Sequence, residues 1–551
     1  MVDLCAEEGF VHVIAYMHVQ NNFFFCNDYL DSDDLTKHRS TSEHFIRSEI
    51  STLIGCMCKA PINWTLPPPQ KFDTMIKRAS TLLSEMEEKL ESVLYTDFQE
   101  QPMIDMTTFG AIHRGAVFYA PDSAYHFQYV DMATQRYVSD TDWLVRNKGY
   151  EPKIAQKILR AIVPDQREQI TKCLKHTNKG SSNNLSILPG FTLNITRLAA
   201  ATGISEQQIS AFLEAFTYPA DAINRDYNHV DDFNEANATP LLKDGSGNYV
   251  LLQYASLAEA VYDSPFYWFC EDTSYEDQAM KHRGEFAETF LVGRLEAIFG
   301  KDKVHANVNV YCGKNRIGEI DCLVVFGSYA LQFQAKSKRL TLSSRQGNIG
   351  KIKEDFKSAV QSAYCQASKC ARFFGKENTI FEDSRGNKIE VPTIGSLYPI
   401  CIVSDHYPSL PMQVRQFLRY KTDEILRPPI VCDVFLIDTI TEMLSSPLRF
   451  LHYIRLRARA VEKVITFSEL ALFGYYLQWN LWLDNGPDLL MLDNSFSTPL
   501  DSAMQVRREG LKGKATPEGI LTKLNNTLIG KLISEIEHNP DPPSVSIGLH
   551  L

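Results

Sequence analysis

The alternation of apolar and polar positions is clearest between residues 281 and 403. A helix is predicted to end at Gly300, because apolar side chains recur before it at helical spacing: Ala287, Leu291, Leu295 and Ile298. Alternating or continuously apolar positions predict three strands, over 304–310, 317–326 and 330–335. The turn Gly327-Ser328 joins the last two strands as a hairpin. A long helix over 352–374 and a strand over 396–403 complete the order α-β-β-β-α-β.

The flanking sequence predicts mainly helices. Residues 72–94 follow the spacing of an amphipathic helix, after an extended break imposed by Pro67, Pro68 and Pro69. Toward the C-terminus the pattern predicts a strand over 430–437 and helices over 447–461 and 467–483. The expected fold class is therefore multidomain α+β, with the α-β-β-β-α-β core flanked by mostly helical N- and C-terminal regions.

The length of 551 residues predicts about three or four domains. The polar stretches at 179–184 and 271–276 are the candidate boundaries. We expect a mostly helical region, a helical or mixed domain, the α-β-β-β-α-β domain and a helical extension, at 1–178, 185–275, 278–408 and 409–551.

Composition narrows the class of protein. With 44% hydrophobic and 22% charged residues, the chain is neither disordered nor collagen-like. No apolar stretch reaches the roughly 18 residues of a membrane span, and the acidic start MVDLCAEEGF is unlike a secretory signal. We therefore expect no membrane partner, a cytoplasmic location, and reduced thiols at the 12 cysteines.

The net charge of −11 is unevenly distributed. Residues 281–376 hold 17 Lys and Arg against 8 Asp and Glu, a net charge of +9, whereas the rest of the chain carries −20. A local basic surface is typical of nucleic-acid binding, although a solvated charged face has the same composition. A helix-turn-helix pattern at 198–210, with Gly203 in the turn, is either a DNA reader or a structural hairpin. Its acidic residues Glu206 and Glu214 favour the hairpin.

Polar side chains interrupt the predicted hairpin of strands. Glu319 and Asp321 share one face of the first strand, and Gln334 and Lys336 share one face of the second. Glu288 lies beside the apolar face of the preceding helix. Ionised groups next to a core are costly unless they pair or bind a metal. Carboxylate, amide and carbonyl oxygens suit Mg²⁺ or Mn²⁺. We expect Glu319 to be solvated or to pair with the basic surface, and not to be a ligand.

The spacing Asp321-x12-Gln334-Ala335-Lys336 resembles the motif of the PD-(D/E)XK nuclease superfamily. The Gln-x-Lys form is similar to that of Mrr-type restriction endonucleases. The runs GEFAE at 284–288, GEIDCLVV at 318–325 and LQFQAKS at 331–337 are similar to the nuclease-related (NERD) domain. The resemblance covers roughly residues 280–405, about a quarter of the chain, and implies a restriction-endonuclease-like core.

This resemblance implies a role for each matching residue. Asp321 would be the central metal ligand, and Gln334 with the Ala335 carbonyl would complete the ligand set. Lys336 would be the catalytic lysine, and Glu288 would bind the metal or its water. Gln366, on the following helix, would face the site. A neutral Gln334 in place of an acid should weaken metal binding, because it lowers the negative charge of the site.

Basic residues beside Lys336 are the candidate phosphate contacts: Lys338, Arg339, Arg345, Lys351 and Lys353. The resulting expectation is a Mg²⁺- or Mn²⁺-dependent nuclease acting on nucleic acid, with DNA and a role in restriction or defence implied by the resemblance. One alternative is a non-catalytic nucleic-acid-binding or regulatory protein that retains the nuclease-like fold. In a degenerate, inactive domain, Asp321 and Lys336 would form a buried ion pair. Another is a scaffold whose acidic N-terminal half recruits an enzyme. Whether the chain binds a partner protein or a second copy of itself stays open.

Overall fold

The computed structural model describes residues 1–22, 30, 45–100, 118, 124–177, 186–219, 223–345, 348–407, 409–483 and 489–539. The chain forms two compact units. Unit 1 comprises Met1–Cys26, Lys37–Tyr119 and Tyr125–Arg283, and unit 2 comprises Asn27–Thr36, Ala120–Ala124 and Gly284–Leu551. The finer division into four regions stays a prediction, and its proposed boundary at 179–184 lies outside the described residues.

Unit 1 is mainly helical in its described part. Its longer helices are α2 (Phe10–Asn22), α4 (Arg47–Met57), α5 (Pro69–Glu100), α7 (His126–Arg136), α9 (Pro152–Thr177) and α13 (Tyr254–Glu271). Helix α5 contains the predicted amphipathic helix, and it contributes Met75, Ala79 and Leu83 to a core shared with α2 and α4. No helix among the described residues is long and apolar enough to cross a membrane.

The helix-turn-helix pattern forms two short helices, α10 (Ile195–Thr202) and α11 (Glu206–Ala215). Gly203 joins them with a positive φ of 70°, a left-handed conformation that glycine adopts without strain. The Ser205 hydroxyl caps α11 by accepting the Gln208 N–H at 3.3 Å. The nearby Arg197 is held by Asp165, with its Nε 2.7 Å from the carboxylate, so this cation is engaged within the unit.

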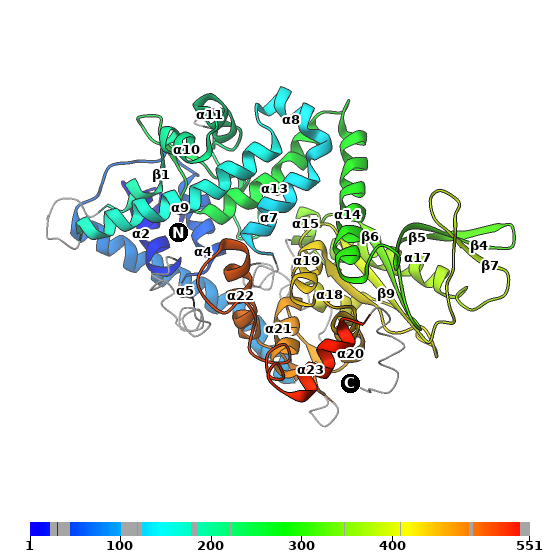
Figure 1. The fold of residues 1–551 in the computed structure, drawn as a ribbon. Coiled ribbons are helices and arrows are strands. Elements are labelled where there is room, and N and C mark those ends of the chain that lie inside the picture. The colour runs from blue at the N-terminus through cyan, green and yellow to red at the C-terminus, as the bar shows by residue number, and fades with distance from the viewer. Residues whose placement is uncertain are drawn as a thin grey trace. The chain divides into compact units, whose positions relative to one another are not determined.

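Unit 2 is built around a seven-stranded mixed sheet of order β10-β9-β6-β5-β4-β7-β8 (Figure 1). The predicted strands are confirmed as β4 (Val304–Cys312), β5 (Asn315–Phe326), β6 (Tyr329–Lys336) and β9 (Ser396–Val403). β4, β5 and β6 are antiparallel neighbours, whereas β9 is parallel to β6 and β10 is parallel to β9. A mixed α and β architecture is therefore present, as expected.

Two parts of the sheet differ from the prediction. The strands β7 (Thr379–Glu382) and β8 (Lys388–Ile389) extend the sheet beyond β4 and were not predicted. The strand predicted over 430–437 is wrong in its second half, because β10 ends at Asp433 and α19 (Val434–Met443) begins there. The Asp433 carboxylate accepts the Leu436 N–H at 2.8 Å and caps this helix.

The long helix predicted over 352–374 is present but contains a π-turn. It comprises α16 (Ile349–Phe356), the π-helical turn Lys357–Gln361 and α17 (Ser362–Ala371). Cys370 and Ala371 of α17 pack with Leu323 and Ala330 of the sheet in a buried apolar cluster. The same helix face therefore covers β5 and β6, where the predicted site residues lie.

Further helices of unit 2 are α18 (Leu410–Phe417), α20 (Pro447–Ala460), α21 (Glu469–Trp479), α22 (Thr498–Glu509) and α23 (Leu528–Glu537). Helices α20 and α21 confirm the two predicted C-terminal helices. The second part of α14 (Glu276–Phe299) belongs to unit 2 and brings Phe299 edge-on to Phe326 of β5 and Phe450 of α20. These ring contacts, with centroids 5.8 and 5.5 Å apart, place α14 against the sheet.

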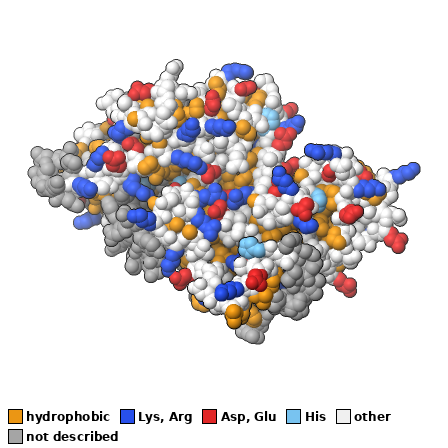
Figure 2. Space-filling model, viewed as in Figure 1, with side chains coloured by type: hydrophobic (Ala, Val, Ile, Leu, Met, Phe, Trp, Pro, Cys, Tyr) orange, Lys and Arg blue, Asp and Glu red, His pale blue; other side chains and the backbone are white. Residues whose placement is uncertain are grey.

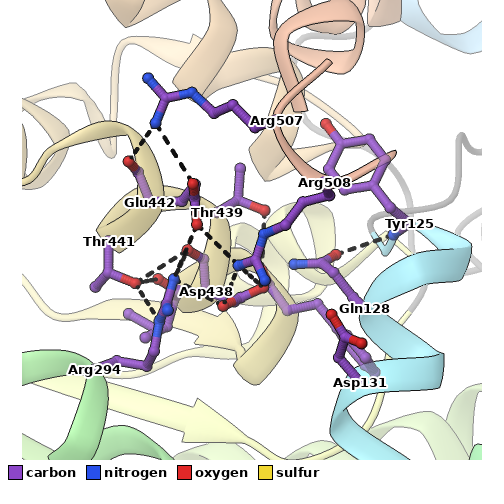
Figure 3. Close-up of polar contacts among 12 residues, drawn as sticks. Tyr125, Gln128, Asp131, Arg294, Asp438, Thr439, Thr441, Glu442, Arg507 and Arg508 are labelled. Carbon is purple, nitrogen blue, oxygen red and sulfur yellow. Dashed lines mark hydrogen bonds and ion pairs between the residues drawn. The ribbon is translucent and has the colours of Figure 1, made fainter. Parts of the chain in front are cut away.

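A network of charged side chains fixes α14 within unit 2 (Figure 3). Arg294 of α14 lies 2.8 Å from the Asp438 carboxylate of α19, and its Nε donates to Thr441 at 2.9 Å. Arg508 of α22 pairs with the same Asp438 at 3.2 Å and with Glu442 at 2.9 Å. Networks of several charges hold geometry better than isolated surface pairs. This anchorage lies less than two helical turns from Glu288.

Candidate functional site

The candidate site begins where strands β5 and β6 separate. Their ladder ends at the pair Cys322 and Phe333. Beyond it, the Ala335 N–H donates to Asp321 Oδ2 at 2.7 Å instead of to a backbone carbonyl of β5. Since the N–H and C=O of one strand residue point to the same side, the Ala335 carbonyl faces the same gap. Asp321, only 9% exposed, therefore occupies the opening between the strands.

Gln334 supplies a buried oxygen without a partner. Its side chain is fully buried, and its Nε2 donates to the Glu319 carbonyl at 3.1 Å. Its Oε1 has no hydrogen-bond partner. Leaving such an acceptor unsatisfied costs about 1–3 kcal/mol, so this oxygen is a favourable ligand for a cation or a donor that enters the site.

Lys336 is positioned by Gln366. The Lys336 ammonium donates to Gln366 Oε1 at 3.1 Å, and Gln366 Nε2 donates to the Glu319 carbonyl at 3.2 Å. Because both ends of the Gln366 amide are engaged, its oxygen is held toward the lysine. The structure thus brings together three side chains expected in the site, Asp321, Gln334 and Lys336, and the helix residue Gln366 that was expected to face them.

Two carboxylates of the site repel each other. Burial raises the pKa of the Glu288 carboxyl, and the charges of Asp321 and Glu319 raise it further, against the opposing charge of Lys336. Burial also raises the pKa of Asp321, although the Ala335 N–H and Lys336 act against this shift. Glu288 makes no hydrogen bond or ion pair with a described residue. A cation between these groups would relieve the repulsion.

The available oxygens fit a hard divalent cation. Asp321 Oδ2 is engaged by Ala335, which leaves Oδ1, and Gln334 Oε1, the Ala335 carbonyl and the Glu288 carboxylate complete the donor set. Carboxylate, amide and carbonyl oxygens are the ligands that Mg²⁺ and Mn²⁺ take in proteins. No cluster of three or more His, Cys, Asp or Glu side chains suited to a metal occurs in the described residues, so a site here depends on the amide and the backbone.

Glu319 contributes its backbone rather than its carboxylate. Its side chain accepts from Arg316 Nη2 at 2.6 Å, and Arg316 Nε donates to Asn309 at 2.8 Å. This agrees with the expectation that Glu319 pairs with a basic residue. Its carbonyl accepts from both Gln334 and Gln366, and it therefore orients the two amides.

Several predicted phosphate contacts are engaged within the protein. Lys338 lies 3.4 Å from the buried Asp355 carboxylate, and Lys351 lies 2.8 Å from Glu354. The Arg339 side chain is only 9% exposed and lies 3.9 Å from Asp405, so it is poorly placed to meet a phosphate. The exposed Lys353 lies with its Nζ 5.9 Å from the Phe417 ring centroid. The Arg345 side chain lies outside the described residues.

Gln332 was not predicted as a site residue. It lies two positions before Gln334 on the same face of β6 and is fully buried. Its Nε2 donates to the Ala367 carbonyl at 3.1 Å, whereas its Oε1 has no partner. The period-two spacing of Gln332, Gln334 and Lys336 in an otherwise apolar strand was the available sequence signal.

Comparisons with known proteins do not identify a family for this chain. The likeness to PD-(D/E)XK, Mrr-type and NERD nucleases rests on the motif and on the order of the elements. Compared with protein-family models, curated proteins and solved structures, the chain matches none.

Proposed function

We propose that this protein is a metal-dependent nuclease that hydrolyses phosphodiester bonds. The observation that carries the proposal is the convergence of Asp321, Gln334 and Lys336 where the β5–β6 ladder ends, with Gln334 Oε1 buried and unpartnered. The order of strands and helices agrees with a restriction-endonuclease-like core. DNA is the proposed substrate, and restriction or defence against foreign DNA the proposed role, by the resemblance of the motif to Mrr-type and NERD domains.

The residues divide the chemistry among them. Asp321, Gln334, the Ala335 carbonyl and Glu288 would hold Mg²⁺ or Mn²⁺. When bound, such an ion supplies Lewis-acid stabilisation of charge on the phosphate and activation of the attacking water. Ala335 fixes the orientation of the Asp321 carboxylate through its N–H. Lys336 carries a positive charge beside the ligands and would stabilise negative charge on the phosphate in the transition state.

A degenerate, inactive domain would use Asp321 and Lys336 as a buried ion pair. Lys336 donates instead to Gln366, and neither Asp321 nor Lys336 makes an ion pair within the described part of the chain. A carboxylate and a lysine that face the same gap without neutralising each other keep their charges available for a ligand. This arrangement favours the nuclease over a degenerate domain that holds the two residues as an ion pair.

The test is cleavage of supercoiled plasmid and of linear single- and double-stranded DNA, with RNA as a further substrate, in Mg²⁺, Mn²⁺ or EDTA. The Asp321→Ala and Lys336→Ala variants accompany the wild type, with Lys369→Ala, an exposed lysine of α17, as the matched control. We expect metal-dependent cleavage that the first two variants lose and the control retains. Cleavage that survives both site variants, or no cleavage of any substrate with either metal, contradicts the proposal.

A further inference from the structure

A strip of exposed basic side chains runs beside the helix that carries Gln366. Lys353 lies on α16 and Lys357 in the π-turn, while Arg419 and Lys421 lie in the segment that follows α18. We call these four residues the basic strip. All four are exposed, and none makes an ion pair with a described carboxylate.

Two side chains of the helix hold the second half of the strip in place. Gln361 Oε1 accepts the Arg419 N–H at 2.9 Å, and Gln361 Nε2 donates to the Arg419 carbonyl at 3.0 Å. Tyr364 repeats this pattern, since its hydroxyl oxygen accepts the Lys421 N–H at 2.9 Å and its O–H donates to the Lys421 carbonyl at 3.1 Å. The helix side chains therefore fix the backbone at both positions, and Arg419 Nη1 also donates to the Gln416 carbonyl at 3.2 Å.

The acidic residues around the strip are few and largely occupied. Glu354 pairs with Lys351, and Asp423 accepts the backbone N–H groups of Ile425 and Leu426. Asp423 and Glu424 are both exposed close to Lys421, and the exposed Glu462 makes a hydrogen bond with Tyr420, which lies between Arg419 and Lys421. On the other side, Arg415 donates to the carbonyls of Val461 and Glu462, which adds a further cation. The strip therefore keeps a net positive charge.

The length of the strip suits a nucleic-acid backbone. Lys353 lies at one end of the strip, and Lys421, whose backbone is held by Tyr364, lies at the other. From Lys353 to Tyr364 the helix rises about 16 Å, at 1.5 Å per residue. Phosphates of one DNA strand follow each other about every 3.4 Å along the axis, so this length spans roughly five of them. Rigidly presented Lys and Arg side chains contact phosphates without reading bases.

We propose that the basic strip binds the sugar–phosphate backbone of the nucleic acid that the site cleaves. This proposal rests on the proposed function and extends it. It moves the main substrate contact away from the segment at 338–345, which ends in the short helix α15 (Leu342–Arg345), to the surface of α16, the π-turn and residues 419–421. Lys338, Arg339 and Lys351 are paired with acids, whereas the four residues of the strip are not.

The test measures binding of a fluorescent 30-base-pair duplex in EDTA across a salt series. The Arg419→Ala/Lys421→Ala variant should bind about tenfold more weakly at moderate salt, and its salt slope should fall by about two. Lys314→Ala/Lys388→Ala removes the same charge at the far hairpins of the sheet and should bind like the wild type. The control surface suits this purpose because Lys and Arg side chains around β4 and β7 are interspersed with Asp and Glu (Figure 2).

The outcomes separate this proposal from the nuclease proposal. Unchanged affinity and slope in the strip variant would overturn the strip, even when the wild type cleaves DNA. Weaker binding by the strip variant alone supports the strip, even when no cleavage is seen. An equal loss of affinity in both double variants would also overturn the strip proposal, because it would show only an effect of net charge. The charge reversal Lys357→Glu should weaken binding further, and circular dichroism confirms that each variant is folded.

Discussion

The Lys336 ammonium donates to Gln366 Oε1 at 3.1 Å and not to the Asp321 carboxylate. The Gln366 amide is itself oriented by the Glu319 carbonyl, 3.2 Å from its Nε2. The carbonyl of one strand thus sets the position of a lysine on the neighbouring strand through a helix residue. Because Gln366 reaches the lysine and not the gap between the strands, we assign it a positioning role.

Replacement of Gln366 by leucine should lower kcat for DNA cleavage about 10- to 100-fold, the usual effect of removing such a support. KM and DNA affinity should change little, because the positive charge of Lys336 remains. Steady-state kinetics and duplex binding measure the two separately. The Cys365→Ala variant alters an exposed neighbour on the same helix turn and should match the wild type. A normal kcat in the Gln366→Leu variant would remove the positioning role.

Neutralising either site carboxylate should stabilise the protein at neutral pH when no metal is added. Asp321 and Glu288 have raised pKa values, so their ionised forms lower the free energy of unfolding. This destabilisation is greatest above the raised pKa, and it disappears as the pH falls below the ordinary carboxyl pKa of about 4. Asp321→Asn and Glu288→Gln should therefore raise Tm at pH 7 in EDTA, with the difference vanishing near pH 4.

Thermal unfolding at the two pH values measures this effect, with the exposed Glu390→Gln as the control. A lower Tm of both site variants at pH 7 would show that the carboxylates are not in conflict.

The Gln334→Glu variant should make stability depend on metal. A buried carboxylate would then face the Glu319 carbonyl, which now accepts the Gln334 amide at 3.1 Å, so Tm should fall in EDTA. Mn²⁺ should restore it and shift Tm more than in the wild type, because an anionic ligand binds the ion more tightly. Gln332→Glu, equally buried on the same strand face, should be destabilised without rescue. Equal rescue of both variants would contradict a metal site at Gln334.

Asp355 should be a stability residue whose contribution is lost in acid. Its carboxylate accepts the Thr341 N–H at 2.7 Å, the Thr341 hydroxyl at 2.8 Å and the Ser344 hydroxyl at 2.5 Å. Burial alone would raise the pKa of Asp355, but the hydrogen bonds of Ser344 and Thr341 outweigh it and lower the pKa. The stabilisation is therefore complete above the ordinary carboxyl pKa and lost as the pH falls through the lower folded value.

At neutral pH, Asp355→Ala should lower the free energy of unfolding by about 3 kcal/mol, since it leaves buried donors without an acceptor. Removal of the exposed neighbouring carboxylate in Glu354→Ala should change it by less than about 0.5 kcal/mol. Urea unfolding at neutral and acid pH measures both. A similar small loss in the two variants would show that Thr341 and the start of α15 (Leu342–Arg345) do not depend on Asp355.

The hairpin of β5 and β6 was predictable because its alternation is local. Side chains two apart on a strand share a face, so the spacing of Asp321, Gln334 and Lys336 is enough to place them together. The fourth strand was also predictable from its apolar run. Periodicity does not predict where the hydrogen-bond ladder between β5 and β6 ends. That point is fixed by the hydrogen bond from the Ala335 N–H to the Asp321 carboxylate.

Other features depend on contacts between distant segments. The apolar run at 430–437 suits a strand or a buried helix equally, and only the cap by Asp433 decides where one becomes the other. In sequence, Arg339 is indistinguishable from its exposed basic neighbours, but in the fold it lies beside Asp405, 66 positions later in the chain. The clamp of Arg419 by Gln361 likewise joins residues 58 positions apart.

Helix α14 sets a limit on how the protein can be divided. It runs unbroken from Glu276 to Phe299 (Figure 1), whereas the boundary between the two compact units falls between Arg283 and Gly284. Glu288 lies only one turn beyond that point. A chain shortened at Gly284 would start inside a helix, with four uncapped N–H groups immediately before Glu288. Separate production of unit 2 should therefore start upstream of Glu276, so that the fraying end stays about three turns away from Glu288 of the candidate site.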